Sequence, residues 1–417
     1  MPENVSAGPR RSNGLVPQLI AQNSVGAIGA FLLIGAAAAN QPWLDRHFLP
    51  SFFLSRSTYV LIKTGSRLAI ASAGLALVIS ARTIGGWAAR SPGQVFRISL
   101  AALLAFAASE VVLRRVHLRP AEWMLPEEEP KRQADVRLGW TLMPGRTGHT
   151  TISRRAIDYA CDAAGYRVRR ADDPVDPERA TLVFAGESIM FGEGLTWEET
   201  IPAQVEAMLG IQSANLSVNG FGSDQIYLRL QSELPRFRRP VVVVSLFMTA
   251  LFGRNLDDDR PHFGPGLVWL PANPQPKLPA LAKLLVPYRR GETVERGISV
   301  TREVLQATVD MARARGATPL IVVPRFGAEG EVDQMLRRRI LDEPGLPYVR
   351  IELDSGSRLP WDRHPNPQAA HEIAAAIAAR LRPAISTGPA DRRGTQSRAA
   401  EGGEGTGHGG GAPRRSS

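Results

Sequence analysis

A serine, an aspartate and a histidine stand in sequence contexts that suit nucleophilic catalysis. Ser188 lies in the segment AGES, directly after an apolar run, and Asp362 and His364 lie in the segment WDRHPNP. A serine hydroxyl becomes a nucleophile when a base lies within hydrogen-bond reach and a third group orients that base. Ser188, His364 and Asp362 can fill these three roles, provided that the fold brings the two segments together.

A glycine-rich turn supplies the remaining part that such chemistry needs. Gly220 and Gly222 lie in NLSVNGFGSDQ. A glycine after a strand lets a backbone N–H face a reacting carbonyl, as an oxyanion hole requires. The chemistry indicated is acyl transfer to serine. Plainer interpretations remain open: Ser188 could cap a helix, Asp362 and His364 could be a solvated turn pair, and Gly220 could be an ordinary turn glycine.

The elements that must position these residues alternate between strand and helix over residues 179–383. Five apolar runs of strand length are separated by amphipathic segments of helical period. The predicted strands are RATLVFA, SANLSV, PVVVVSLFM, TPLIVVP and PYVRIEL. This alternation predicts an α/β fold, a three-layer α/β/α sandwich around a parallel five-stranded sheet. Ligands of such sheets bind at the carboxyl ends of the strands, where Ser188 and Gly220 are expected.

The same residues resemble the sequence blocks of the SGNH (GDSL-type) hydrolases, over about half of the chain. Gly186-Glu187-Ser188 corresponds to the family's Gly-Asp-Ser block, and Gly220 follows Asn215 by five residues, as the family's oxyanion glycine does. Asp362 and His364 precede the final helix, as in the last block. The resemblance implies that Ser188 is the nucleophile, His364 the base and Asp362 the orienting acid, without a cofactor or a metal.

The third block departs from the family pattern. The family has a Gly-x-Asn-Asp segment whose Asn donates to the oxyanion, whereas this chain has SLFMTALFGRN. Thr249 occupies the position of that Asn by strand register, and Asn255 could reach back through a loop. Thr249 is slightly preferred, because it falls at the carboxyl edge of the strand. The Asp362–His364 spacing of two resembles that of membrane-linked and glycan-modifying members of the family.

The first 117 residues are expected to form a membrane region with about three transmembrane helices. The apolar runs are Val25–Ala39, Leu68–Ser80 and Ile98–Leu113. A spanning helix needs about 20 mostly apolar residues, so each run requires its flanks to reach that length. The alternative is a set of buried Ala-rich core helices. Residues 118–178 are expected to be a connecting, β-rich lead-in, 179–385 the hydrolase-like domain and 386–417 a disordered tail.

Basic residues leave the membrane orientation nearly balanced. An N-terminus inside the cytoplasm would place Arg10, Arg11, Arg82, Arg90 and Arg97 inside. It would place an equal group outside: Arg46, Arg56, Arg114, Arg115 and Arg119. Three spans with this orientation predict a multi-pass protein of the cytoplasmic membrane, with its catalytic domain outside the cytoplasm.

Composition excludes several other classes of protein. The net charge of +10 and the pI near 10.4 invite a nucleic-acid partner, but the basic residues are scattered among acidic ones, which disfavours one. The single cysteine, Cys161, excludes an intramolecular disulfide and a cysteine-rich zinc site. Asp257, Asp258 and Asp259 are adjacent carboxylates without a calcium-loop glycine, so no metal site is expected there.

Three functional hypotheses follow. The first is a membrane-anchored serine esterase that cleaves an ester or O-acyl group of a small molecule or glycan through an acyl-enzyme. The second is an O-acyltransferase that modifies a cell-envelope glycan, which would need an envelope-biosynthesis partner protein to supply the acyl donor. The third is a non-catalytic envelope module of the same fold. The proline-rich stretch 258–290 is long for a loop and could form a lid or a substrate wall, or be a disordered excursion.

Overall fold

The computed structural model describes most of the chain. The described residues are 15–40, 48–50, 56–115, 129–152, 154–256, 260–273, 276–279, 288–360 and 364–386. Two predictions therefore lie outside the described residues: the role of Asp362, and the disordered tail beyond Ser386. The aspartates 257–259 also lie outside them.

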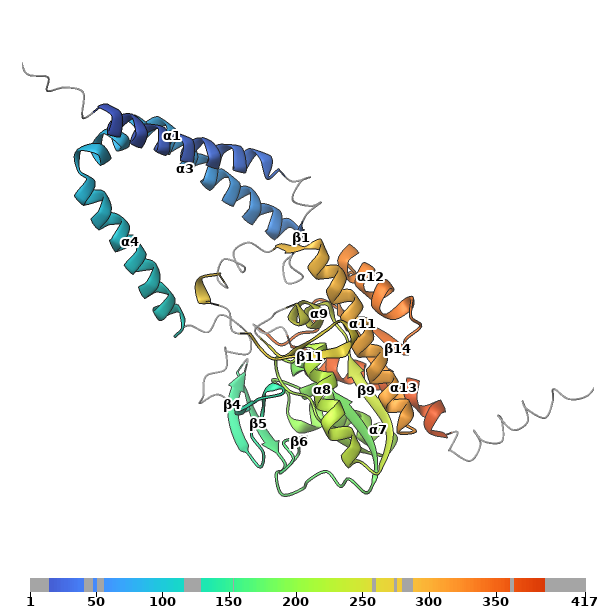
Figure 1. Ribbon diagram of the computed structural model, residues 1–417. Helices are drawn as coiled ribbons and strands as arrows, with labels where there is room; N and C mark the ends of the chain where they lie inside the picture. The colour runs from blue at the N-terminus through green and yellow to red at the C-terminus, as the bar shows by residue number, and fades with distance from the viewer. Residues whose placement is uncertain are drawn as a thin grey trace, which may run out of the picture.

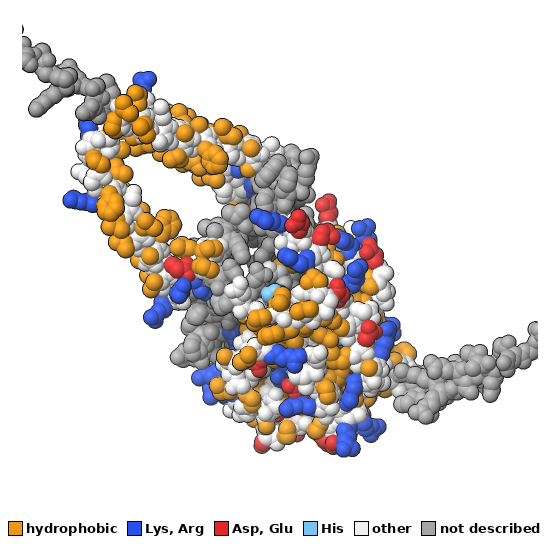
Figure 2. All heavy atoms as spheres, in the orientation of Figure 1, with side chains coloured by type: hydrophobic (Ala, Val, Ile, Leu, Met, Phe, Trp, Pro, Cys, Tyr) orange, Lys and Arg blue, Asp and Glu red, His pale blue; other side chains and the backbone are white. Residues whose placement is uncertain are grey.

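Three long apolar helices precede the α/β domain: α1 (Leu15–Ala38), α3 (Arg56–Arg90) and α4 (Pro92–Leu113). All three are long and apolar enough to cross a membrane. In Figure 1, α1 and α3 run side by side and α4 diverges from them. Hydrophobic side chains cover these helices, whereas charged side chains are scattered over the visible face of the α/β domain (Figure 2). The prediction of three apolar helices is confirmed, and their crossing of a bilayer stays a prediction.

Glycines bring α1 and α3 into close contact. A Cβ atom added to Gly29 would lie 2.7 Å from the carbonyl oxygen of Gly74, and one added to Gly74 would lie 2.8 Å from that of Gly29. The two backbones thus approach too closely for any side chain at either position. Small residues at such crossings are typical of helix pairs that pack within a bilayer.

An eight-stranded sheet forms the centre of the remaining chain, with the strand order β14-β13-β9-β7-β8-β6-β5-β4. Its parallel strands are β7 (Ala180–Ala185), β8 (Gln212–Asn215), β9 (Arg239–Leu246), β13 (Thr318–Phe326) and β14 (Tyr348–Leu353). These five strands are the ones that the sequence predicts. The sheet is wider than predicted, because strands of the lead-in extend it antiparallel to β8.

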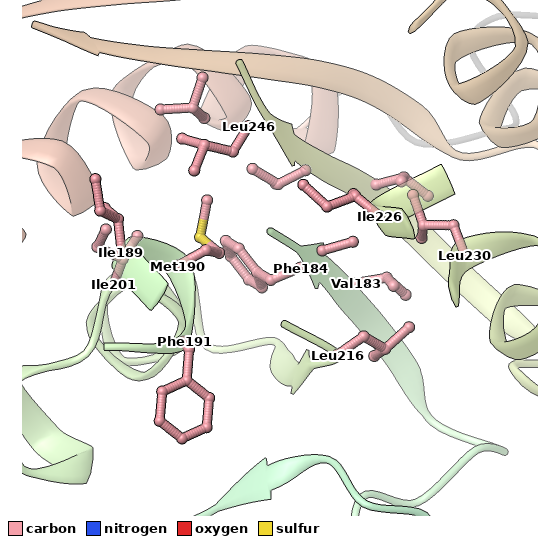
Figure 3. Close-up of a cluster of buried hydrophobic side chains, with 14 of the residues drawn as sticks. Val183, Phe184, Ile189, Met190, Phe191, Ile201, Leu216, Ile226, Leu230 and Leu246 are labelled. Atoms are coloured by element: carbon pink, nitrogen blue, oxygen red, sulfur yellow. The ribbon is translucent and has the colours of Figure 1, made fainter. Parts of the chain in front are cut away.

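Helices cover both faces of the parallel strands. On one face α7 (Ile201–Leu209) packs against α13 (Pro367–Ser386), and on the other α8 (Ser223–Glu233) packs against α11 (Gly291–Ala314). The strands are buried from both sides, which explains their continuous apolar sequences. Figure 3 shows part of this core, where Phe184 of β7, Leu246 of β9 and Ile226 of α8 lie close together. A short helix, α12 (Glu331–Arg337), follows β13.

The lead-in contains β2 (Arg132–Asp135), β3 (Gly139–Leu142), β4 (Thr147–Ile152), β5 (Arg155–Cys161) and β6 (Arg167–Val168). The guanidinium of Arg167 is fully buried and donates to the carbonyl oxygens of Phe191 at 2.7 Å and Leu195 at 2.6 Å. Burial lowers the pKa of Arg167 to about 10, so the group stays charged at neutral pH. The lead-in therefore fixes the turn that follows β7, in addition to widening the sheet.

The structure describes parts of the stretch after residue 258. It forms a hairpin of β10 (His262–Gly264) and β11 (Val268–Leu270), followed later by β12 (Tyr288–Arg290). Strand β12 pairs antiparallel with β1 (Phe48–Pro50), which lies between α1 and α3. The carboxylate of Glu110, near the end of α4, accepts hydrogen bonds from the amides of Lys277 at 2.8 Å and Leu278 at 2.9 Å. This stretch therefore connects the α/β domain to the apolar helices at two places.

Candidate active site

Ser188 begins a short helix, α6 (Ser188–Phe191), immediately after the carboxyl end of β7. Glu187 caps this helix, since its carboxylate accepts a 3.0 Å hydrogen bond from the amide of Ile189. Gly192 ends the helix with a φ of 85°, a conformation that favours glycine. The side-chain amide of Asn215 donates to the carbonyl oxygens of Met190 and Phe191, in the last turn of α6. Ser188 is thus held on a rigid turn at the edge where parallel sheets bind ligands.

The structure brings His364 to Ser188. The Nε2 atom of His364 lies 2.8 Å from the Oγ atom of Ser188, within hydrogen-bond distance. The segment between β14 and α13 carries His364 back across the sheet edge. This segment is fixed by a hydrogen bond of 2.8 Å from the amide of Leu359 to the carbonyl oxygen of His364, and by a β-bridge between Arg358 and Pro365. Asp362, which the sequence predicts to orient this imidazole, lies outside the described residues.

A buried carboxylate, Glu187, touches the nucleophile. Its Oε2 atom accepts a hydrogen bond from the Ser188 hydroxyl and forms an ion pair with Arg254, whose Nη1 atom lies 3.3 Å away. Burial would raise the pKa of Glu187. Arg254, His364 and the hydrogen bonds from Ser188 and Ile189 outweigh burial and hold this pKa below its ordinary value. Glu187 is therefore ionised at neutral pH and can only accept hydrogen bonds.

A second carboxylate lies beside the imidazole. The Oε2 atom of Glu193 is 3.6 Å from Nε2 of His364, and the side-chain amide of Asn219 donates to the same oxygen. Glu193 follows α6 in a turn whose conformation depends on Arg167 and Gly192. Sequence analysis missed Glu193 and Asn219, because neither belongs to a motif and both reach the site through turns.

The turn that contains Gly220 is fixed on two sides. Gly220 has a φ of 82°, and its carbonyl oxygen accepts a 2.8 Å hydrogen bond from Arg260. The indole of Trp140, in β3, donates to the carbonyl oxygen of Asn219 at 3.0 Å. A Cβ atom at Gly220 would lie 3.4 Å from the Trp140 ring, so the positive φ and the close ring both favour glycine. The role of Gly220 as an oxyanion donor stays a prediction.

The two predicted third donors make hydrogen bonds elsewhere. Thr249 begins α9 (Thr249–Asn255), and its hydroxyl donates to Asp333 of α12. The side-chain amide of Asn255 donates to Thr301 at 3.2 Å, and its oxygen accepts from the amide of Asp224. Neither contact involves Ser188 or His364. The residue of α9 that does reach the nucleophile's surroundings is Arg254, which sequence analysis did not single out.

A cavity of about 190 Å³ opens at the carboxyl ends of β9 and β13. Its walls include Met248, Phe326, Arg325 and Arg358, the last of which belongs to the segment that carries His364. The guanidinium of Arg358 stacks over the Phe326 ring at 4.0 Å. Glu329 and Asp333 also line the cavity and pair with its arginines, so it combines apolar surface with arginine–carboxylate pairs at the sheet edge where the candidate site lies.

The other candidates of the sequence lie away from this site. His371, on α13, contacts the side chain of Gln204 at the surface through its Nδ1 atom. Cys161 is buried in the lead-in, and burial raises the pKa of its thiol to about 12. A thiol with so high a pKa is a poor nucleophile. Among the described residues, no group of histidine, cysteine and acidic side chains is arranged to hold a metal ion.

Comparisons with solved structures return distant likenesses. No family model matches the chain, and no curated protein matches it significantly. An acetyl xylan esterase from the rumen bacterium Butyrivibrio proteoclasticus is 12% identical, with a TM-score of 0.32, over 51% of this chain and 66% of that one. A carbohydrate esterase of family two from Cellvibrio japonicus is 15% identical, with a TM-score of 0.31, over 50% and 62%. The chain thus spans just under two thirds of both proteins.

A third structure is covered almost completely. It is a protein described as lipolytic and of the G-D-S-L family, from Desulfitobacterium hafniense. It is 11% identical, with a TM-score of 0.31, over 48% of this chain and 98% of that one. Likenesses this distant say nothing of substrate or catalytic residues, so the function has to be argued from the geometry of the site.

Proposed function

We propose that the chain is a membrane-anchored serine esterase that cleaves an ester or O-acyl group through an acyl-enzyme. The observation that carries the proposal is the 2.8 Å distance between Ser188 Oγ and His364 Nε2 at the carboxyl edge of a parallel sheet. The two residues are 176 positions apart in the chain, and each lies on a separately fixed turn. A nucleophile with a base in reach is the minimum that this chemistry requires.

In the proposed mechanism, the Ser188 hydroxyl turns its single proton from Glu187 to Nε2 of His364. Ser188 then attacks the ester carbonyl as His364 takes that proton. The amides of Ser188 and Gly220 donate to the oxyanion, and Asp362 orients the imidazole. His364 then gives its proton to the leaving alcohol, and water attacks the acyl-enzyme by the reverse sequence. The carboxylate of Glu193, 3.6 Å from Nε2, stabilises the imidazolium that forms in both halves of the cycle. No step needs a cofactor.

The substrate is proposed to be an O-acylated small molecule or glycan bound at the sheet edge. The cavity beside the carboxyl ends of β9 and β13 offers apolar surface for an acyl chain, and paired arginine and carboxylate side chains for polar groups. The apolar helices α1, α3 and α4 are proposed to anchor this domain to the cytoplasmic membrane, with the domain outside the cytoplasm.

A Ser188→Ala substitution tests the proposal. With a short-chain acyl ester as substrate, the variant should lose about 10⁴ or more in kcat and still unfold like the wild type, because only the attacking oxygen is removed. Ser232→Ala is the matched control, since Ser232 lies on α8 and its hydroxyl donates to carbonyl oxygens of its own helix. An organophosphonate should label wild-type Ser188 covalently. Undiminished activity in Ser188→Ala would end the serine-esterase proposal.

The same preparation distinguishes hydrolysis from transfer. An acylated substrate is offered with and without a sugar acceptor, and the acyl group is followed by mass spectrometry. Release as the free acid in both cases supports the esterase. Acyl sugar that forms in a Ser188-dependent manner would instead support the O-acyltransferase. A chain that neither cleaves the ester nor reacts with the phosphonate would be the non-catalytic module.

A further inference from the structure

Arg254 lies between the two turns that build the proposed oxyanion hole. Its Nη1 atom donates to the carbonyl oxygen of Phe221 at 2.9 Å and to Oε2 of Glu187 at 3.3 Å. Phe221 follows Gly220 in the chain, and Glu187 precedes Ser188. The guanidinium therefore joins the neighbours of the two residues whose amides are proposed to bind the oxyanion. This contact is made from α9, across the sheet edge.

The guanidinium and the nucleophile share one oxygen atom. Oε2 of Glu187 contacts both Nη1 of Arg254 and the hydroxyl of Ser188, so a single atom separates the positive charge from the attacking group. The Arg254 side chain is only 14% exposed, and Glu187 is more deeply buried. The Nε atom of Arg254 is also buried and has no hydrogen-bond partner within the described part of the chain. Among the described residues, the group thus has one buried N–H donor, that of Nε, without an acceptor.

The geometry points to Arg254 as the third donor to the oxyanion, with Glu187 as its counter-ion. This inference rests on the esterase activity proposed above. In the tetrahedral intermediate, negative charge develops on the former carbonyl oxygen, and a fixed guanidinium in a poorly solvated site stabilises that charge strongly. Glu187 holds the guanidinium in place. It also keeps the resting pair neutral, so that neither buried charge is left alone.

The pairing accounts for two departures from the SGNH pattern together. The first block carries Glu187 where the resembling family has Asp, and the segment after the third predicted strand lacks the expected Asn. The longer Glu187 side chain reaches both Ser188 and Arg254. The Thr249 hydroxyl and the Asn255 amide, which are the other donors from this segment, are bonded to Asp333 and Thr301.

The test compares single and double substitutions at this pair. Arg254→Met should lower kcat by about 10²–10³ with little change in KM, as the loss of one oxyanion donor does. Arg254→Lys should recover part of that loss, because it keeps the charge but not the planar donor geometry. Arg315→Met is the matched control: Arg315 also donates to a phenylalanine carbonyl oxygen, that of Phe237, but at the far end of β9. It should retain wild-type kcat.

The double variant Arg254→Met with Glu187→Gln separates catalysis from charge balance. It removes the buried carboxylate that Arg254→Met leaves unpaired, so its unfolding temperature should return towards that of the wild type. If Arg254 donates to the oxyanion, kcat should stay low in the double variant. Recovery of wild-type kcat would overturn the inference, because Arg254 would then only neutralise Glu187.

Two other results would also overturn the inference about Arg254, and they have different consequences for the proposed esterase. If Thr249→Val or Asn255→Ala lowers kcat while the Arg254 variants do not, the third donor lies elsewhere and the esterase stands. If the wild type neither cleaves esters nor binds the phosphonate, the esterase proposal fails and the role of Arg254 falls with it. Should Arg254→Met not fold, Arg254→Lys and the double variant still give the answer.

Discussion

Two carboxylates lie beside the proposed catalytic pair: one contacts the nucleophile and the other lies near the base. Glu187 contacts the hydroxyl of Ser188 and is compensated by Arg254. Glu193 lies 3.6 Å from Nε2 of His364 and is partly exposed, and its neighbour is the neutral amide of Asn219. Glu193 therefore places a carboxylate beside the group that becomes positive during catalysis, which is where a negative charge helps the reaction.

Glu193→Gln should lower kcat/KM at neutral pH by severalfold to about tenfold, because the charge is partly screened by solvent. Glutamine keeps an oxygen for the Asn219 amide. Without the carboxylate, the imidazole gains its proton only at lower pH, so the acid limb of the kcat/KM profile should move to lower pH. Glu198→Gln, at an exposed pair with Arg169, is the control and should leave the profile in place. An unmoved acid limb in Glu193→Gln would contradict this role.

The sequence allowed only part of this site to be predicted. Ser188 and His364 could be found because each lies beside a clear strand or helix signal, and the topology of a parallel sheet brings such ends together. Arg254 and Glu193 could not, because their places depend on the direction of α9 and on the turn after α6. The structure brings Ser188 and His364 together, and the catalytic roles of all six predicted residues, Ser188, His364, Asp362, Gly220, Thr249 and Asn255, stay predictions.

At the scale of elements, the hairpin of β10 and β11 is attached to the turn of the proposed oxyanion hole. Arg260 donates to the carbonyl oxygen of Gly220, and the carboxylate of Asp224 accepts a 2.7 Å hydrogen bond from the amide of Phe263 in β10. Burial raises the pKa of Asp224 to about 7, although the Phe263 amide and Arg260 oppose the shift. The attachment of this hairpin therefore depends on a carboxyl group that titrates near neutral pH.

This pKa sets a pH dependence of stability. Between about pH 4 and pH 7 the folded protein holds the Asp224 proton more tightly than the unfolded chain does, so the free energy of unfolding should fall as pH rises through this window. Asp224→Asn cannot ionise and keeps an oxygen for Phe263. The difference in Tm between Asp224→Asn and the wild type, measured by thermal unfolding, should rise in favour of the variant by several degrees from pH 4.5 to pH 8.

A change at an exposed carboxylate provides the comparison. Asp310→Asn, on α11, removes a surface pair with Arg313 and should shift the whole curve of Tm against pH by little. If the curves of Asp224→Asn and the wild type run parallel from pH 4.5 to pH 8, then Asp224 is ionised in the folded protein throughout, and the hairpin does not depend on its proton.

The five parallel strands were predictable because both of their faces are buried, which leaves uninterrupted apolar runs. The additional strands β4, β5 and β6 were expected only as a separate β-rich lead-in. Their pairing with β8 depends on a single short contact, between Arg167 and Asn215, that no local pattern indicates. The stretch 258–290 was expected as a lid or wall, and its hairpin packs on α8 through Tyr227 and Phe263.

At the scale of the whole molecule, the α/β domain contacts the apolar helices at one end of their length. The segment between α1 and α3 contributes β1, which pairs with β12 of the domain, and the end of α4 contacts Lys277 and Leu278. The connection between α3 and α4 lies at the end of the helices that is away from the α/β domain (Figure 1). If α1, α3 and α4 each cross the membrane, as proposed, the domain and β1 would lie on one side and the connection between α3 and α4 on the other.

Reporter fusions test this arrangement in cells. An alkaline phosphatase joined at about residue 390 should be active, because it lies outside the cytoplasm with the domain, and one joined after Ser91 should be inactive. A fluorescent protein that folds only in the cytoplasm should give the reverse pattern at the two sites. Active phosphatase after Ser91 and none at residue 390 would place the catalytic domain in the cytoplasm, as the balanced arginine counts allow.

The β1–β12 pairing has a consequence for how such an enzyme would meet its substrate. A domain that hangs from one linker rotates freely and samples a hemisphere, whereas a second attachment removes most of that rotational freedom. With the helices in a bilayer, as proposed, the nucleophile would keep a nearly constant distance from the lipid surface and a nearly constant orientation. Acyl groups held at that height would be present at a high effective concentration, and those beyond it would be out of reach whatever their chemistry.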